Sequence, residues 1–525
     1  MNRLITSVIF GLVGLNTVIM ADPSRPKLVV GIVVDQLRSD YLEYLQSLFG
    51  EKGFKRLMKD GVYMRDVDFK AKGLDAVNAT AIAFTGNYPN ATGVPSANVY
   101  RPSTKQASAP LEDPEAIGNF TTETFSPAAL RLSTISDEVA IDGAGVSAVY
   151  SIAPDPQQAV IMAGHAGNCA IWINENTGKW ATSTYYHDVP GAVNTRNYNR
   201  PLANRIDTMQ WKPSLPLERY PGLPAQKRIY PFRYTFPTSD RNVYRMFMSS
   251  PLVNTEVTDL AIDCLQGMNL GKRGDAIDML NVAYTAAPYK YVKDGDFRLE
   301  LEDTYLRLDS QLGRLFDAIE KSVGLDNALI YLTGTGYYDD AVTDDAAYRI
   351  PSGEFSVKRA TSLLNSYLSA KHGNADYIDS YYNGHIYLDH GVIEGKRLSP
   401  ADVADDARTF LCKMSGVADA YTLPEILSIS SASLESLRLA TDPKNCGDIF
   451  VEFSPGWTVS DDLRFPVEKK PVRSSMILTP AFIMAPGVEP KVIGNTVEAV
   501  KLAPTVTSTL RIRAPNGITE RPLSL

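Results

Sequence analysis

The sequence is poor in the side chains that most often bind transition metals. Five histidines and four cysteines occur among 525 residues. Neutral imidazole is a preferred zinc ligand, so the sequence offers few positions for a histidine-ligated zinc site. The small number of histidines does not by itself exclude such a site. The cysteines lack the close spacing of a zinc site, and they are Cys169, Cys264, Cys412 and Cys446. Cys412 and Cys446 are the candidate disulfide by proximity in sequence, and buried thiols are the alternative.

The chain also lacks a basic excess and, after its first residues, any long apolar run. Lys and Arg number 52 against 60 Asp and Glu, which gives a net charge of -8 and argues against nucleic-acid binding. Residues 1–21 have a basic start, an apolar middle and Ala21 before a polar break, which is typical of a secretory signal. A retained membrane anchor is the alternative, but Gly11 and Gly14 interrupt the run. We expect export of residues 22–525 to a periplasm or the cell exterior, with no transmembrane span after cleavage.

What the chain contains is an alternation of buried strands and helices. Residues 27–34 form an apolar, β-branched run that ends at Asp35, and residues 303–322 place apolar side chains at helical spacing. The alternation predicts an α/β fold with a mainly parallel sheet covered on both faces, which is a three-layer α/β/α sandwich. The further predicted strands are 147–152, 159–163, 279–284, 328–333, 448–453 and 476–484.

Two segments break this alternation. Residues from about 168 to 245 are rich in Pro, Tyr, Arg and Asn, and residues from about 339 to 397 are irregular. We interpret both as cap-like insertions into one domain. The Tyr- and Arg-rich part of the first is either a recognition surface for a glycan, peptide or envelope protein or a cap packed over a cleft.

Seven short motifs, in order along the chain, carry a family resemblance. They are Val-Val-Asp-Gln-Leu-Arg-Ser-Asp-Tyr at residues 33–41, Gly-Phe-Lys-Arg-Leu at 53–57, Thr-Gly at 85–86 with Pro89, Ala-Gly-His at 163–165, Ser-Thr-Tyr-Tyr at 183–186, Glu-Asp-Thr-Tyr-Leu-Arg-Leu-Asp at 302–309, and Ala-Pro-Thr at 503–505. Together they resemble the alkaline phosphatase superfamily, specifically exported phosphate-irrepressible alkaline phosphatases of the PafA type, which share their fold with type I phosphodiesterases and nucleotide pyrophosphatases. The resemblance implies an alkaline-phosphatase-like sandwich.

In active members of this family, two zinc ions hold the phosphoryl group and activate a Thr or Ser nucleophile. The resemblance places Ala76 at the nucleophile position, and a methyl group cannot attack phosphorus. It places a phosphate-binding asparagine near Ala97 or at Asn98. Thr80, one helical turn beyond Ala76, is a remote alternative nucleophile.

The metal-ligand and phosphate-clamp positions also depart from the family pattern. The resemblance assigns the zinc ligands to Asp35, Pro288, Val292, Thr335, Gly336 and either Val472 or Arg473, and only Asp35 has a suitable side chain. The family's Lys and Arg clamp corresponds to Asp155 and Gln157. The five histidines lie outside these windows, so we expect them to be structural.

Two further metal readings remain open. Asp35 is either a vestigial metal ligand or a strand-end carboxylate that caps backbone N–H groups. An acidic loop offers oxygen ligands for calcium, or is simply solvated, at Asp339, Asp340, Asp344 and Asp345.

The residues therefore favour a pseudo-phosphatase, an exported binding or scaffold protein that retains the fold, with no cofactor expected. Its partner would be an envelope protein, a glycan or a small ligand. The alternative is a metal-dependent phosphomonoester or phosphodiester hydrolase with a rebuilt active site.

Overall fold

The computed structural model describes residues 25–187, 189–292, 296–339, 352–463, 467–472 and 477–525. The predicted signal segment 1–21 lies outside these residues. Their centre is an 11-stranded sheet in the order β21-β2-β20-β12-β1-β11-β6-β7-β8-β5, with β22 beside β2. Its bounds are β1 Leu28–Asp35, β2 Val62–Asp68, β5 Gly118–Asn119, β6 Val149–Ala153, β7 Cys169–Ile173, β8 Trp180–Ser183, β11 Asp278–Thr285, β12 Ala328–Gly334, β20 Thr479–Met484, β21 Lys491–Ile493 and β22 Val497–Glu498.

The middle of the sheet is parallel, as the apolar runs predict. β1 pairs in parallel with β11 and with β12, and β11 pairs in parallel with β6. β1 is buried along its length except at its last residue, Asp35, because helices cover both faces. The carboxyl ends of these strands meet at one edge of the sheet, where open α/β folds bind ligands.

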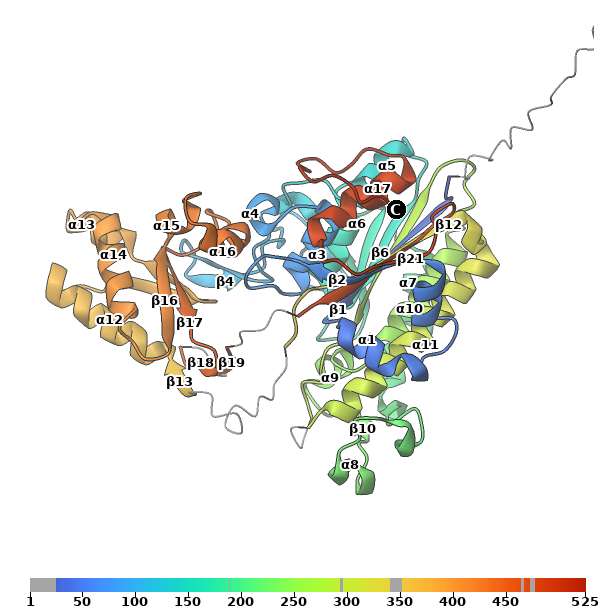
Figure 1. The fold of residues 1–525 in the computed structure, drawn as a ribbon, viewed down its shortest axis with the longest axis horizontal. Coiled ribbons are helices and arrows are strands. Elements are labelled where there is room, and N and C mark those ends of the chain that lie inside the picture. Colours follow the sequence, from blue (N-terminus) through green and yellow to red (C-terminus); the bar gives the residue numbers. More distant parts are fainter. Residues whose placement is uncertain (1–24, 188, 293–295, 340–351, 464–466, 473–476) are drawn as a thin grey trace, which may run out of the picture.

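Helices form a layer on each side of the sheet, which confirms the three-layer α/β/α prediction (Figure 1). One layer contains α3 Ala76–Thr85, α5 Ile135–Asp142, α6 Pro156–Ala163 and α17 Leu502–Leu510. The other contains α1 Ser39–Leu45, α7 Gly191–Asn199, α10 Leu252–Gly267 and α11 Arg298–Ser322. The predicted helix 303–322 is therefore present, and it begins earlier, at Arg298.

A cap lobe, residues 353–472 with a gap at 464–466, lies beside the sandwich (Figure 1). It has its own apolar core, which includes Leu364, Val403 and Ile449. A four-stranded sheet in the order β14-β15-β17-β16 packs against helices. The elements are β13 Gly353–Ser356, α12 Val357–His372, β14 Ile378–Tyr382, β15 His385–Leu388, α13 His390–Gly395, α14 Pro400–Leu411, β16 Val417–Thr422, α15 Leu423–Leu427, α16 Glu435–Ala440, β17 Ile449–Phe453, β18 Trp457–Asp461 and β19 Glu468–Pro471.

Two strand predictions need correction. Residues 159–163 form the end of helix α6, because Asp155 caps its N-terminus by accepting from the Gln158 N–H and Pro156 occupies its first turn. Residues 448–453 do contain a strand, but it is β17 of the cap lobe. A single apolar run does not reveal which of two sheets it joins.

The insertion bounds also differ from expectation. β7 and β8 belong to the main sheet, so the first insertion begins after Ser183. The segment expected to be irregular from 339 to 397 contains α12 over Val357–His372, and the lobe continues past 397 to β19. None of the four cysteines, all within the described residues, forms a disulfide.

Candidate functional site

A cavity of about 1080 Å³ lies between the sandwich and the cap lobe. Its walls come from the ends of β1 and β11, from the first residues of α3 and α6, and from the facing cap strands β14 and β15. It therefore occupies the sheet edge at which strand-end side chains converge, and both sequence motifs and the cap contribute to it.

Asp35 lies at the end of β1, on the wall of this cavity. The Thr335 hydroxyl donates to its Oδ1 at 3.2 Å, and the Tyr337 hydroxyl also bonds to the carboxyl group. The pKa of Asp35 is raised to about 6, because the effect of burial is larger than the opposing effect of these two hydrogen bonds. Both partners follow β12, which pairs with β1, so they reach Asp35 from 300 residues away.

The turn after β1 holds these groups in place. Gln36 adopts φ 59°, in the left-handed region, and its N–H donates to Thr335 Oγ1 at 2.8 Å. Its side-chain Oε1 accepts from the Asp339 N–H at 2.8 Å. Thr335 therefore both accepts a hydrogen bond from Gln36 and donates one to Asp35, so the three residues form a local network. Among the described residues, no Lys, Arg or His side chain lies at bonding distance from the Asp35 carboxyl group.

Ala76 is the first residue of α3, as the motif register places it. Asp75 precedes it and caps the helix, with Oδ1 accepting from the backbone of Val77 and Asn78. Thr80 is buried; it donates to the Ala76 carbonyl at 2.6 Å and accepts from Gln158 at 3.0 Å. Its hydroxyl is thus held inside the protein. The structure brings Ala76 to the cavity wall but does not include Thr80 in it.

Asp155 and Gln157 face the same cavity from the start of α6. Ala97 joins this helix to α3: its N–H donates to Asp75 Oδ2 at 2.7 Å, and its carbonyl accepts from Gln157 Nε2 at 2.8 Å. Asn98 is exposed and also lines the cavity. Sequence reasoning missed Asp75, Gln158 and Tyr337, and only the capping position of Asp75 before a helix signals one of them.

The pKa of Asp155 is raised to about 6, mainly by burial; hydrogen bonds from the Gln158 and Gln157 backbone oppose the rise, and the nearby carboxyl groups of Asp75 and Glu123 add to it. No ion pair to Asp155 occurs among the described residues. The start of α6 therefore presents negative charge to the cavity, at the positions where the resemblance assigns a Lys and an Arg that bind phosphate.

The positions that the resemblance assigns to zinc do not form a zinc-binding set here. Thr335 bonds to Asp35, Gly336 has φ +71° and lies against Phe69, and Val472 packs on the cap core. Pro288 and Val292 offer no ligand atom in their side chains. No three His, Cys, Asp or Glu side chains converge within the described ranges, and Arg473 lies outside them. A single carboxylate with hydroxyl partners does not fit a tetrahedral zinc site.

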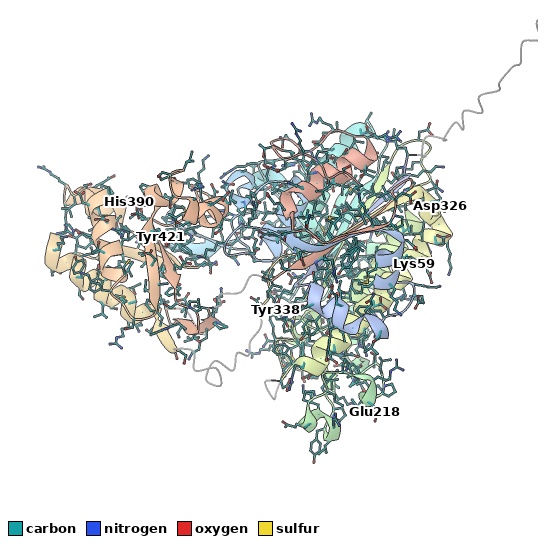
Figure 2. The ribbon with its side chains drawn as sticks, in the orientation of Figure 1. Lys59, Glu218, Asp326, Tyr338, His390 and Tyr421 are labelled. Carbon is teal, nitrogen blue, oxygen red and sulfur yellow. The ribbon has the colours of Figure 1, made fainter. Side chains whose placement is uncertain are left out.

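The calcium hypothesis falls mainly outside the described residues, since only Asp339 of its four aspartates is described. The histidines that form contacts do so as structural groups. His165 bonds to Asp137 and to the Leu130 carbonyl, and His390, which lies in the cap lobe (Figure 2), bonds to Asp448. His385 lines the cavity from β15, where burial lowers its pKa to about 4.

Comparison with known proteins agrees with the fold. The chain is 28% identical over 524 residues to alkaline phosphatase PafA of Elizabethkingia meningoseptica, covering 95% of this chain and 94% of that protein. It is 27% identical over 516 residues to alkaline phosphatase PhoV of Synechococcus elongatus, covering 94% and 92%. The crystal structure of a PafA mutant superposes with a TM-score of 0.83 at 28% identity, covering 95% of this chain and 98% of that chain.

No helix among the described residues is long and apolar enough to cross a membrane. A family model for type I phosphodiesterase / nucleotide pyrophosphatase matches residues 29–473, which is most of the chain. The sheet order, the helix layers and these matches agree over nearly the whole sequence. The chain belongs to the type I phosphodiesterase / nucleotide pyrophosphatase family, within the alkaline phosphatase superfamily.

Proposed function

We propose that this chain is a pseudo-phosphatase, an exported protein that retains the phosphatase fold and uses the cavity to bind a ligand or partner. The observation that carries the proposal is the environment of Asp35. Its carboxyl group is bonded by the hydroxyls of Thr335 and Tyr337, and these residues follow the strand from which the resemblance expects two zinc ligands.

The start of α3 supports the same proposal. Ala76 has no nucleophilic atom, and the neighbouring Thr80 hydroxyl is buried and bonded to a helix carbonyl. Nucleophilic phosphoryl transfer needs a hydroxyl that a base or a metal activates and that can approach phosphorus in line. Neither residue supplies one.

Export follows in this proposal from residues 1–21, with the mature chain in a periplasm or outside the cell. The partner is then an envelope protein, a glycan or a small ligand. The alternative function is a metal-dependent phosphoric ester hydrolase with a rebuilt site, and the family supports it as a class.

Metal content and turnover test the choice. The mature protein, purified without chelator, is analysed for zinc by elemental analysis and assayed with p-nitrophenyl phosphate and bis-p-nitrophenyl phosphate with added zinc, calcium or manganese. We expect no stoichiometric zinc and no hydrolysis above buffer. Stoichiometric metal with turnover that Asp35→Asn abolishes would instead establish the hydrolase.

A further inference from the structure

The start of α6 has a charge pattern opposite to that of an anion site. Asp155 caps the helix with its carboxyl group and lines the cavity, and the carboxyl groups of Asp75 and Glu123 lie near enough to raise its pKa. A bound phosphate dianion would meet three carboxyl groups here. A cationic group would gain from all three, because like charges repel and opposite charges attract most strongly where water is scarce.

Two of these carboxyl groups already have hydrogen-bond donors. Asp75 accepts from the backbone of Val77, Asn78 and Ala97, and Glu123 accepts from Trp172 Nε1 at 2.8 Å. Asp155 accepts only from backbone N–H groups of its own helix, and no Lys, Arg or His pairs with it among the described residues. Asp155 thus has capacity left for a ligand, and the Oε1 atom of Glu123, whose two printed donors both bond to Oε2, has some as well.

Three of the cations on the cavity wall have carboxyl partners of their own. Lys72 pairs with Glu452, Arg245 with Glu175, and Lys470 with Glu468. Lys290 lies on the wall nearer to Asp35, whose pKa it lowers slightly. Lys470 also lies near enough to Asp75 to lower its pKa, but none of these cations forms an ion pair with Asp155 among the described residues.

Gln157 supplies a second, independent indication. Its side chain is 5% exposed and lines the same cavity, and its Oε1 receives no hydrogen bond within the described part of the chain. Its Nε2 is committed to the Ala97 carbonyl, which orients the amide. A buried acceptor without a donor is costly, by about 1–3 kcal/mol in general. Oε1 itself is buried beneath the cavity wall, so a ligand N–H that reached it through a small side-chain shift would remove this penalty.

A primary ammonium group matches both features, since it carries a positive charge and three N–H donors. We propose that the cavity binds a ligand through a primary ammonium group held by Asp155 and Gln157. The inference rests on the proposed function, because it concerns the same cavity in a protein that binds and does not hydrolyse. The shared chemistry admits a small amino alcohol, a polyamine or an amino sugar.

Titration calorimetry on the full mature chain tests the proposal, with ethanolamine, 1,5-diaminopentane and glucosamine as separate probes. The N-acetylated form of each probe is the uncharged control. We expect at least one amine to bind below about 1 mM and its fully acetylated form to bind at least about tenfold more weakly. Inorganic phosphate is expected to show no competition.

Variants at the two residues assign the contact. Asp155→Asn retains the helix cap but removes the charge, and should weaken amine binding about tenfold or more. Gln157→Met removes the acceptor and should weaken amine binding. Gln157→Glu keeps acceptor oxygens but loses the donor to the Ala97 carbonyl, and its affinity for the amine should stay within about threefold of the wild-type value. Asp389→Asn is the matched control, since Asp389 caps α13 outside the cavity and should leave binding unchanged.

The pH dependence provides a readout that a purely structural role would not move. With a pKa of about 6, Asp155 is about nine-tenths ionised at pH 7 and about one-tenth at pH 5, so 1,5-diaminopentane should bind about tenfold more weakly at pH 5. Asp75 and Glu123 face the same carboxyl group, and Asp155→Asn should remove most of the pH dependence.

Equal binding of acetylated and free amines, tighter binding of phosphate, or no amine binding up to about 10 mM would overturn the proposal. These results leave the proposed function standing if zinc and turnover are also absent. Hydrolysis with stoichiometric metal would refute the proposed function itself, whatever the amine titrations show.

Discussion

Replacing Asp35 with asparagine distinguishes two roles for this residue, a partly buried structural carboxyl group and a metal ligand. The pKa of Asp35 is raised from 3.8 to about 6, mainly by burial. A tenfold change in proton affinity corresponds to about 1.4 kcal/mol, so the ionised form is disfavoured in the folded protein by about 3 kcal/mol at most. The residue is only partly buried in the cavity wall, and water reduces this penalty to about 1–2 kcal/mol.

The sign follows from proton binding. Between pH 3.8 and about 6 the folded state binds this proton and the unfolded state does not, so stability contributed by Asp35 falls as pH rises through that window. Above about pH 6 the full penalty applies. The asparagine side chain keeps an oxygen that accepts from Thr335 and Tyr337 and carries no charge. We therefore expect Asp35→Asn to raise the free energy of unfolding by about 1–2 kcal/mol at about pH 7.5, and by about nothing at about pH 4.

The assay is urea unfolding followed by tryptophan fluorescence at both pH values, with and without EDTA. Asp389→Asn, a carboxyl-to-amide change at a helix cap outside the cavity, should alter stability by less than about 0.5 kcal/mol, because asparagine caps helices as well as aspartate does. Destabilisation by Asp35→Asn at the higher pH, or zinc-dependent stability that this variant loses, would refute the reasoning and identify Asp35 as a ligand.

Two other substitutions test the site and the lobe contact. Ala76→Thr restores a hydroxyl at the first residue of α3 but no group to activate it, so hydrolysis of p-nitrophenyl phosphate with zinc should stay at the wild-type level; a rise would contradict the proposed function. Arg131→Ala removes both hydrogen bonds, 3.0 and 2.8 Å, to the buried Asp442 of the cap lobe. Because the Arg131 side chain is 36% exposed and Asp442 keeps its bond from Asn445, the free energy of unfolding in urea should fall by about 1.5–3 kcal/mol. Arg408→Ala, which loses an exposed pair with Asp405, should cost less than about 1 kcal/mol, and equal effects would refute the assignment.

The sandwich could be predicted because its signals are local. The apolar run at 27–34 corresponds to β1, and the helical spacing at 303–322 corresponds to α11. A strand buried on both faces gives a continuous apolar run, whereas a helix buried on one face gives apolar residues three or four positions apart. The run at 159–163 was misassigned because a short apolar segment has no period of its own. Asp155 and Pro156, a helix-start signal, outweighed it.

The candidate site could be predicted only in part. The motif order placed Asp35, Ala76, Asp155 and Gln157 on one functional edge, and all four line the cavity. The sequence does not predict the groups that contact these four residues. Thr335 bonds to Asp35 from 300 positions away, and Ala97 links Asp75 to Gln157 through its backbone N–H and carbonyl. A backbone N–H or carbonyl outside a helix cap, such as those of Ala97, carries no sequence signature.

The sequence by itself determined the family, the layered architecture and the identity of the side chains at the cleft, because these depend on residue type, periodicity and order. Only the tertiary structure decided that hydroxyl groups bond to Asp35, that Asp155 lies near two other carboxyl groups, and that the cap lobe forms part of the cavity wall. Those facts depend on distances between segments far apart in the chain, and the pKa of about 6 at both Asp35 and Asp155 arises from the burial that this packing creates.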